Sequence, residues 1–462
     1  MDCLIYYELL ERSYDNILLI KYELEKRGYS VKLCNALSVE FWKSLFYRPK
    51  VVIIGAARSN KSLSLYHPFL FKESLVYLNM QEEQIAYSGE ADLKLFIPVE
   101  KARDIPHFTW GSFAVDYLRR GNVSENNIVR VKPIQFDFCN KKLGAYFYSR
   151  KYMAKKYGLD INKKWIMFAS DFVITSLAAN EEELDILCMR TYSIYEKTWH
   201  AEKDLQDRLE KWFGRFLKEH RDYIIIYRPH PDERRYHDFV KRLNDKYDNF
   251  YYIGNYSIKQ WLSVIDVFTT WFSTAIMEAY YAGVPSFALG DGKKLEEEGI
   301  SISLFDGNKY IQDYDTFESC MVKTQENVEK YFPLNNKMVE RYYGKYDYEF
   351  GYKKIADYVD DILKDRNRYN SLKVHLTRAE KASNSETRNR LIKSSLYNDI
   401  FRTLRPILWY LIPFKRKSII KFSKELERYE KKELKKREKR LWKVLENLED
   451  NGDIQNNKRA EV

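Results

Sequence analysis

Short apolar runs that alternate with helix-like stretches occupy most of the chain, and this alternation limits the fold more than any other feature. In the first third, the runs that predict strands include Cys3–Glu8, Ser30–Asn35, Val51–Ala57 and Leu93–Val99. The run that begins at Val51 is apolar throughout, which is typical of a parallel strand buried on both faces. Strands that alternate with helices predict parallel sheets with helices packed on their faces.

A second series of the same kind follows the first. Its predicted strands are Trp165–Ser170, Tyr223–Arg228, Phe250–Gly254, Val267–Thr270 and Pro285–Gly290. Two such series predict an α/β protein with two Rossmann-like, doubly wound domains. We expect one domain over residues 1–150, a second over residues 151–365, and a helical, basic extension over residues 366–462.

The basic character of the chain is concentrated near its C-terminal end. The 462 residues carry a formal net charge of +11. Between Lys415 and Lys443 there are 14 lysines and arginines against 5 glutamates, a net of +9, so the remainder is near +2. With 45% hydrophobic and 16% aromatic residues, the globular part can bury a large core and is not itself strongly basic.

The cysteines and the first residues bear on the cellular compartment. The five cysteines are scattered and form no CxxC or Cys/His cluster, so a disulfide framework or a zinc site is not expected and a reducing cytoplasm fits best. The first ten residues lack the basic and apolar regions of a signal peptide. No window reaches roughly 18 uninterrupted apolar residues, so we expect no transmembrane helix.

The strongest candidate motif is Arg228–Pro231, the sequence RPHP directly after a predicted buried strand. Each proline holds the residue before it in an extended conformation, so Arg228 and His230 project beyond the sheet. They do so at the carboxyl end, where open α/β sheets bind ligands. Arginine can grip a phosphate with two hydrogen bonds, and histidine can donate a proton to a departing phosphate oxygen. The alternative is an ordinary surface turn with His230 as polar filler.

A second candidate motif lies between Thr269 and Pro285. Ser273 or Thr274 is expected to cap a helix that Gly283 ends. The free N–H groups at such a helix start bind phosphate, and the hydroxyl groups add donors. Glu278 is not in capping-box spacing from either hydroxyl, which leaves it available to accept from a ribose hydroxyl pair. The alternative is an ordinary capped helix between two strands.

Both motifs follow strand ends of the second domain, about 45 residues apart. If they converge, one crevice offers an arginine, a histidine, helix amides and hydroxyls, which suits the phosphate of a nucleotide-activated donor. The chain has no P-loop and no GxGxxG, which disfavours kinases and Rossmann dehydrogenases.

These motifs resemble the nucleotide-binding half of GT-B glycosyltransferases that build bacterial surface polysaccharides. YRPHPDE, followed by FSTAIMEAYYAGVPSFALGDG, is most similar to capsule and lipopolysaccharide Kdo transferases, and more distantly to CDP-glycerol glycerophosphotransferases. The resemblance implies that His230, Ser273 and Thr274 contact the donor phosphate, and that Glu278 with Gly283 forms the ribose-binding pattern. The glycerophosphotransferases usually have an aspartate in place of Glu278, which favours a sugar donor here.

A transferase also needs a group that deprotonates the acceptor or attacks the donor. Glu82 and Glu83 follow a predicted strand of the first domain and are the candidates for this role, with Glu8 as a further possibility. We find no DxD motif that would demand a divalent metal, and we expect no metal and no organic cofactor. We expect Asp232 and Glu233 to lie on the rim of the site, within a run of charges.

The segment Leu396–Phe414 combines aromatic and aliphatic side chains and is followed directly by the basic run. Such a segment suits a helix in the interface of an anionic membrane. The alternatives are a helical hairpin that packs on the body or a coiled-coil arm. No motif supports nucleic-acid binding.

The sequence therefore predicts a glycosyltransferase in the cytoplasm, peripheral on the inner face of the cell membrane. Its first domain would receive a surface polysaccharide or glycolipid acceptor, and its second a nucleotide-activated sugar, with CMP-sugars among the candidates. One alternative is transfer of glycerol- or ribitol-phosphate from a CDP-linked donor. The other is a membrane-associated scaffold without activity.

Overall fold

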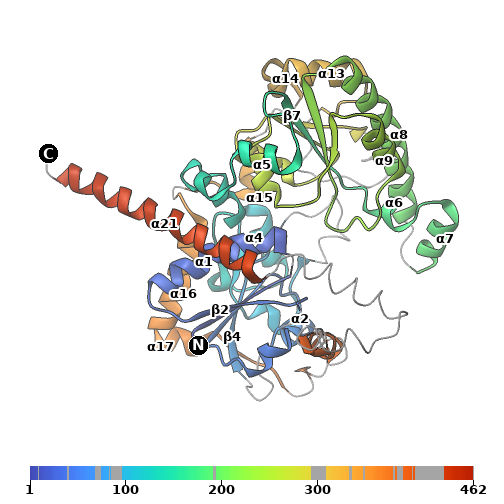
Figure 1. Cartoon of the computed structure of the whole chain (residues 1–462). Helices are drawn as coiled ribbons and strands as arrows, with labels where there is room; N and C mark the ends of the chain where they lie inside the picture. Colours follow the sequence, from blue (N-terminus) through green and yellow to red (C-terminus); the bar gives the residue numbers. More distant parts are fainter. Residues whose placement is uncertain are drawn as a thin grey trace. The chain divides into compact units, whose positions relative to one another are not determined.

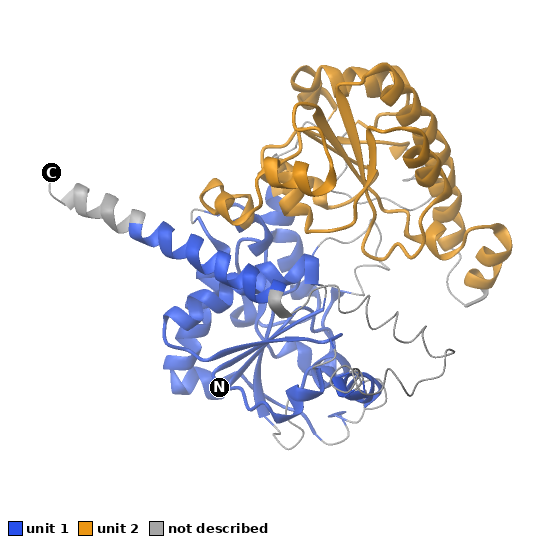
Figure 2. Cartoon of the chain, viewed as in Figure 1, with its two compact units in different colours: residues 1–84, 93–137, 340–462 blue, residues 85–92, 138–339 orange. Residues whose placement is uncertain are grey.

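A computed structural model describes residues 1–8, 10–38, 41–67, 74–82, 84, 96–190, 194–292, 309–331, 336–346, 349–377, 380–381, 389–397, 399–400 and 431–460 (Figure 1). The chain forms two compact units. Unit 1 contains residues 1–84, 93–137 and 340–462, and unit 2 contains residues 85–92 and 138–339 (Figure 2).

Unit 1 is built on a seven-stranded sheet in the order β2-β1-β3-β4-β5-β6, with β12 paired to β4. The six strands of this path are parallel and β12 is antiparallel. The strands are β1 (Cys3–Tyr7), β2 (Val31–Asn35), β3 (Val51–Ile54), β4 (Ser74–Asn79), β5 (His107–Thr109), β6 (Ile128–Arg130) and β12 (Lys373–His375). The buried runs predicted to form strands at Cys3 and Val51 are therefore adjacent central strands.

Helices pack on the sheet of unit 1. The α-helices are α1 (Asp15–Lys26), α2 (Asn60–Leu65), α4 (Ser112–Arg120), α16 (Gly351–Lys364), α17 (Arg366–Ser371) and α21 (Lys431–Ala460). Short helical turns are η1 (Leu10–Tyr14), η2 (Phe41–Phe46), η3 (Glu100–Arg103) and η4 (Glu125–Asn127). Alternate strand residues such as Leu4, Val52 and Leu75 share one core cluster with Leu63 of α2, as a period of two requires.

One strand expected in this unit is replaced by another. We expected a strand over Leu93–Val99, but residues 96–99 form none and residues 93–95 lie outside the described part. The neighbour of β4 is instead β5, where Asn79 pairs with His107. Pro98 explains the failure, because proline cannot donate to a central ladder.

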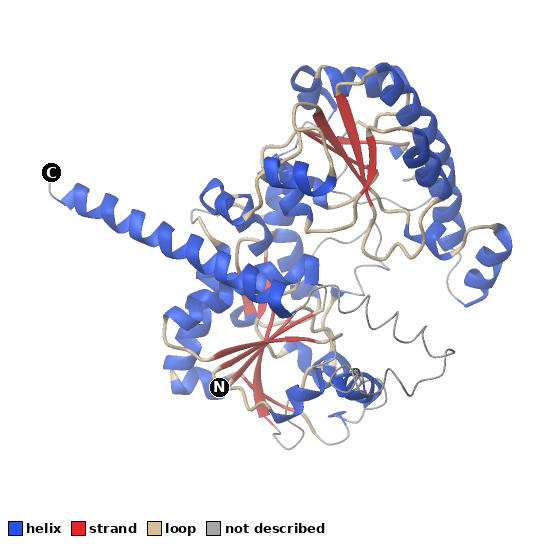
Figure 3. Cartoon of the chain, viewed as in Figure 1, coloured by secondary structure: helices blue, strands red, loops and turns tan. Residues whose placement is uncertain are grey.

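Unit 2 contains a five-stranded, fully parallel sheet in the order β11-β10-β7-β8-β9 (Figure 3). Its strands are β7 (Lys164–Ala169), β8 (Tyr223–Arg228), β9 (Phe250–Tyr252), β10 (Val267–Thr270) and β11 (Ser286–Ala288). All five predicted strands are thus confirmed in kind, with ends that differ by a few residues. The protein has the two Rossmann-like folds expected of it.

Helices cover both faces of this second sheet (Figure 3). They are α5 (Arg150–Tyr157), α6 (Val173–Leu177), α7 (Glu181–Arg190), α8 (Ile194–Glu219), α9 (Asp238–Lys246), α10 (Ile258–Leu262), α11 (Ala275–Tyr281), α13 (Tyr314–Val322) and α14 (Thr324–Tyr331). Before them come η5 (Ile134–Cys139) and η6 (Lys141–Tyr146), and α15 (Asn336–Tyr343) lies where the chain passes back to unit 1. Phe168 of β7, Phe213 of α8 and Phe317 of α13 meet in one core.

The basic C-terminal extension includes a long helix that packs on unit 1. Figure 1 shows α21 alongside α1, where Trp442 meets the ring of Tyr22 edge to face. Arg437 is buried and lies 3.3 Å from a carboxylate oxygen of Glu11 and 3.5 Å from one of Asp15. The extension is thus anchored at least partly by packing. Most of the apolar segment Leu396–Phe414, from residue 401 onward, lies outside the described residues.

Candidate functional site

The candidate site lies at the carboxyl edge of the sheet in unit 2. Three neighbouring strands end there in register, since Thr270 of β10 pairs with Ala169 of β7 and Ala169 pairs with Arg228 of β8. The loop after β8 carries His230, and the loop after β10 carries Ser273. The two motifs therefore leave the same edge from strands separated only by β7, or about 10 Å at ordinary strand spacing.

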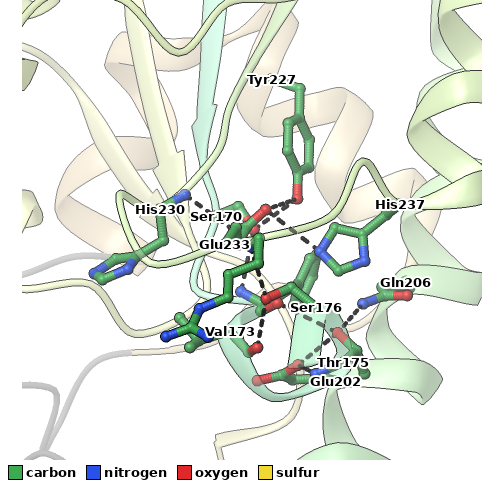
Figure 4. Close-up of polar contacts among 12 residues, drawn as sticks. Ser170, Val173, Thr175, Ser176, Glu202, Gln206, Tyr227, His230, Glu233 and His237 are labelled. Carbon is green, nitrogen blue, oxygen red and sulfur yellow. Dashed lines mark hydrogen bonds and ion pairs between the residues drawn. The ribbon is translucent and has the colours of Figure 1, made fainter. Parts of the chain in front are cut away.

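His230 is half exposed, and its hydrogen bonding fixes the tautomer of the neutral ring. Its Nδ1 accepts the backbone N–H of Asp232 at 3.2 Å, so the proton of the neutral imidazole is on Nε2. That Nε2 lies 4.0 Å from Oδ1 of Asp171, in the loop after β7. Figure 4 shows the ring of His230 directed away from the polar network beneath its loop.

Glu233 does not lie on the rim, and the expectation for this residue was wrong. Its side chain is fully buried and accepts the backbone N–H of His230 at 3.0 Å. The other carboxylate oxygen lies 3.2 Å from the hydroxyl of Tyr227 and 3.3 Å from Nε2 of His237 (Figure 4). Only Asp232 is exposed, as expected. The loop folds Glu233 inward because this carboxylate satisfies a backbone donor that the prolines leave without a ladder partner.

Arg228 is buried, and its guanidinium donates to the carbonyl of Tyr256 at 2.7 Å. Tyr256 has a left-handed backbone with φ of 68°, a conformation that costs energy in a non-glycine residue. Arg228 thus ties the end of β8 to the loop after β9. Any phosphate contact would have to use the other N–H groups of the same guanidinium.

Asp171 is a residue that sequence reasoning missed. It follows the strand between the two motifs, and its Oδ2 is buried without a hydrogen-bond partner among the described residues. Burial, with a smaller contribution from the charge of Glu233, raises the pKa of Asp171 to about 7. The available signal was its place directly after the predicted strand Trp165–Ser170, at the edge where ligands bind.

A second buried carboxylate supports the same loop from below. Glu202 of α8 accepts the backbone N–H groups of Ile174 and Thr175 at 3.1 and 2.7 Å and the hydroxyl of Thr175 at 2.6 Å. It thereby satisfies the free donors at the start of α6. Burial raises the pKa of Glu202 to about 8, although the hydrogen bonds from Thr175 act in the opposite direction.

The start of α11 leaves its hydroxyl groups only lightly engaged. Thr274 occupies the N-cap position but makes no side-chain cap hydrogen bond, and it is exposed. Ser273 accepts a long hydrogen bond, 3.4 Å, from the backbone N–H of Ala275. Either residue was expected to cap the helix by its side chain, and the structure shows only this weak contact. The two hydroxyl groups can therefore turn toward a ligand at low cost.

Glu278 and Gly283 lie along and beyond α11. Glu278 is partly exposed, and its backbone carbonyl accepts the N–H of Ala282 at 2.9 Å. Gly283 has a φ of 72° and donates its N–H to the carbonyl of Tyr280, which is the left-handed ending that glycine favours. The glycine has a conformational reason to be present.

The first unit contains the carboxylates predicted as candidate bases. Glu82 follows β4 and accepts the hydroxyl of Ser13 at 2.7 Å. Gly55, after β3, is its neighbour, and a Cβ there would lie 3.4 Å from the Glu82 carboxyl carbon, at van der Waals distance. Glu8 accepts a hydrogen bond from the hydroxyl of Tyr66. Glu83 lies outside the described residues.

One group of side chains resembles a metal site in composition. Ligand-type atoms of Glu219, His220 and Glu318 lie within 4.8 Å of one another, the only such group among the described residues. Glu219 already accepts from Arg215 at 3.0 Å and from the hydroxyl of Tyr314 at 2.6 Å. Glu219 and His220 precede β8, at the opposite edge from His230, and Glu318 lies on α13; the contacts of the group are those of an ion-pair cluster.

Comparison with known proteins identifies the fold. No protein-family model and no curated protein matches this chain. The structure of the wall teichoic acid polymerase TagF matches with a TM-score of 0.50 and 11% identity, over 79% of this chain and 89% of that chain. A histidine-to-asparagine variant of that polymerase, soaked with CDPG, gives 0.51 and 13%, over 78% and 88%. The likeness shows a shared fold of the GT-B type.

The pKa of Glu202 leads to a prediction about stability and pH. Between about pH 4.5 and 8 the folded state keeps the proton that the unfolded state loses, so stability decreases as pH rises through this window. Glu202→Gln removes the titration. We expect its melting temperature relative to wild type to rise between pH 5 and pH 9, by the equivalent of a few kcal/mol in order of magnitude.

Glu210, on the same helix, is the matched control. Its hydrogen bond with Arg242 lowers its pKa, so Glu210→Gln should shift the relative melting temperature in the opposite direction over the acid range. Parallel behaviour of the two variants would contradict the assignment of a buried, protonated Glu202.

Proposed function

We propose that the protein is a GT-B glycosyltransferase that transfers a sugar from a nucleotide-activated donor to a surface polysaccharide or glycolipid acceptor. The observation that carries the proposal is the register of β10, β7 and β8, which brings the loops of both motifs to one edge. That edge offers an imidazole, two hydroxyl groups and a helix start, which together suit the phosphate of a donor.

Each residue has a proposed role in this reaction. His230 donates a proton toward the departing phosphate, and Arg228 adds positive charge while it holds the loop after β9. Ser273 and Thr274 donate hydrogen bonds to the same phosphate. Glu278 accepts from the ribose hydroxyls. These roles require no metal ion, because fixed donors and charge stabilise the leaving group.

The acceptor side is proposed to belong to unit 1. Glu82 is the better supported general base, because the hydroxyl of Ser13 holds its carboxylate at the carboxyl edge of the sheet. Glu83 remains a second candidate from the sequence. An ionised carboxylate can accept the proton of an acceptor hydroxyl.

A second candidate function is the transfer of glycerol- or ribitol-phosphate from a CDP-linked donor. The shared fold with a wall teichoic acid polymerase favours it. Such a reaction would use the same phosphate pocket, but the bond broken lies between the two phosphates of the donor. The glutamate at position 278 is the sequence feature that favours a sugar instead.

A place on the inner face of an anionic membrane is proposed for the C-terminal extension. Lys435, Lys439 and Lys443 are exposed at four-residue spacing on α21, whereas Leu441 and Leu445 are buried. The helix therefore presents a row of ammonium groups on the side opposite its packing face. None of the described helices is long and apolar enough to cross a bilayer. A membrane-associated scaffold without activity would have the same row of lysines, so this surface does not distinguish it from a transferase.

Nucleotide binding tests the donor site directly. CMP, CDP, UDP, GDP and their sugars are added separately, and the melting temperature is recorded. A ligand that binds the native state raises it, by the equivalent of about 2.7 kcal/mol at one hundred times Kd. His230→Ala should abolish transfer, with a loss of roughly 100-fold or more, and should leave the fold intact because the ring is half exposed.

Unchanged turnover in His230→Ala would favour the scaffold. Tyr236→Ala serves as a control, because Tyr236 is an exposed residue close by in sequence that has no proposed role.

The donor that reacts separates the two transferase hypotheses, because a CMP-sugar and a CDP-polyol both release CMP. Sugar transfer from a UDP- or GDP-sugar releases the nucleoside diphosphate, whereas polyol-phosphate transfer from a CDP-polyol releases CMP. We expect release only with sugar donors, measured by chromatography of each reaction with acceptor present. Release of CMP from CDP-glycerol, with no reaction of any nucleotide sugar, would replace the first proposal by the second.

Vesicle binding tests the membrane surface. Lys435→Glu with Lys439→Glu should weaken sedimentation with phosphatidylserine vesicles by at least about 30-fold, since each basic residue near such a surface contributes roughly 1 kcal/mol. Lys151→Glu with Lys155→Glu is the matched pair, exposed at the same spacing on α5. Equal effects of the two pairs would refute a specific role for α21.

A further inference from the structure

We infer that Asp171 is a positioning residue for His230, and that the two side chains titrate together as a pair that holds one proton, the shared proton, which the site delivers to the departing phosphate. The inference rests on the proposed function, and it assigns a role to a residue that none of the motifs contains. Asp171 comes from β7, the strand that lies between the strands of the two motifs.

Two aspartates flank the same imidazole at nearly equal distance. Oδ1 of Asp171 lies 4.0 Å from Nε2, and Oδ2 of Asp232 lies 3.8 Å from Nδ1. They differ in exposure, because the side chain of Asp232 is 67% exposed and that of Asp171 only 14%. Water and salt screen the carboxylate of Asp232, while the carboxylate of Asp171 acts through the protein interior.

The groups that face the pair reinforce its preference for a proton. The buried carboxylate of Glu233 lies behind Asp171 and raises its pKa, after burial itself. Glu233 in turn contacts Tyr227 and His237, and Glu202 lies beyond it on α8. Glu233 thus raises the pKa of both Asp171 and Glu202, in each case after burial. A proton on the pair lowers the negative charge of this cluster.

The backbone fixes which side of the ring faces Asp171. The amide of Asp232 donates to Nδ1, and the amide of His230 itself is held by Glu233. The ring can therefore direct only Nε2 toward the edge of the sheet, where Oδ1 of Asp171 lies beside it. Oδ2 of Asp171 has no hydrogen-bond partner among the described residues, which leaves it able to bond a ligand or to hold the shared proton.

The pair transfers its proton in the same way with either class of donor. The pair begins with one proton beyond the neutral ring and the carboxylate, so it has no net charge. The acceptor hydroxyl oxygen forms its bond to the transferred group and gives its proton to the general base. At the same time the bond between the departing phosphate oxygen and the transferred group breaks, and its electron pair stays on that oxygen. Nε2 gives its proton to the oxygen and takes up the proton of Asp171, which leaves a neutral imidazole, with Nδ1 still accepting from Asp232, and an ionised Asp171.

The decisive experiment is a titration of the His230 ring by NMR in the full chain without ligand. His230→Gln identifies the signal among the seven histidines. Asp171→Asn should lower the pKa of His230 by about one unit or more, because an opposite charge at this distance favours the charged ring. Asp232→Asn should lower it by much less, and added salt should remove that smaller effect but not the larger one.

A second readout separates positioning from mere support of the fold. Asp171→Asn should bind CDP at pH 8 at least as tightly as wild type, because one negative charge near the phosphate is gone. Turnover should nevertheless fall at least tenfold, with its pH dependence displaced. Asp171→Ala should show the same CDP binding and the same loss of turnover as Asp171→Asn. This variant controls for any effect of the asparagine side-chain amide. Its melting temperature reports whether it folds.

The outcomes are distinct for the two proposals. Equal changes in the ring pKa for both asparagine variants, or none for Asp171→Asn, overturn the shared proton. If Asp171→Asn clearly changes the ring pKa of His230 but the protein binds none of the nucleotides, the pair stands and the proposed function is overturned. Weaker CDP binding at every pH, with an undisplaced pH profile, makes Asp171 structural only.

Discussion

The hydrogen bond from the backbone of His230 to the buried carboxylate of Glu233 is the contact on which the candidate site depends. A strand that ends in Arg-Pro-His-Pro has lost its regular partners, and its amide must find another acceptor. Glu233 supplies that acceptor from the same loop, three residues later. The carboxylate is costly to bury, but Tyr227 and His237 surround it with polar atoms. The loop is thereby fixed, and the imidazole is held at the edge of the sheet.

The order of the strands gives this fixed loop its chemical neighbours. In a doubly wound sheet, strands are added first on one side of the first strand and then on its other side. The first strand here is β7, with β8 on one side and β10 on the other. Ligands bind outside the carboxyl ends of the strands, at the point where the strand order reverses. Residues about 45 positions apart in the sequence thus meet one edge, and the loop after β7 lies between the loops of both motifs. Asp171 occupies that place, which is why a single carboxylate there can influence the whole site.

The sequence predicted the strands of unit 2 well because each is a nearly continuous apolar run, and a run of that kind is informative in a parallel sheet. It also predicted that His230 and Ser273 leave the same edge. It failed for Glu233, since a carboxylate within a run of charges looks solvated unless its acceptor role is known. Asp171 and Glu202 were missed for a related reason. Their contacts cross between elements, and no local pattern records that α8 lies under α6 or that β12 returns to β4.

The central claim is that the loops after β7, β8 and β10 enclose one phosphate. A crystal of the protein soaked with CDP tests this most directly. We predict density for a phosphate within hydrogen-bond distance of Nε2 of His230 and of the hydroxyl of Ser273 or Thr274, with Asp171 beside the ring. Density for the nucleotide at another edge of the sheet, or His230 turned away from a phosphate bound elsewhere, would contradict the account.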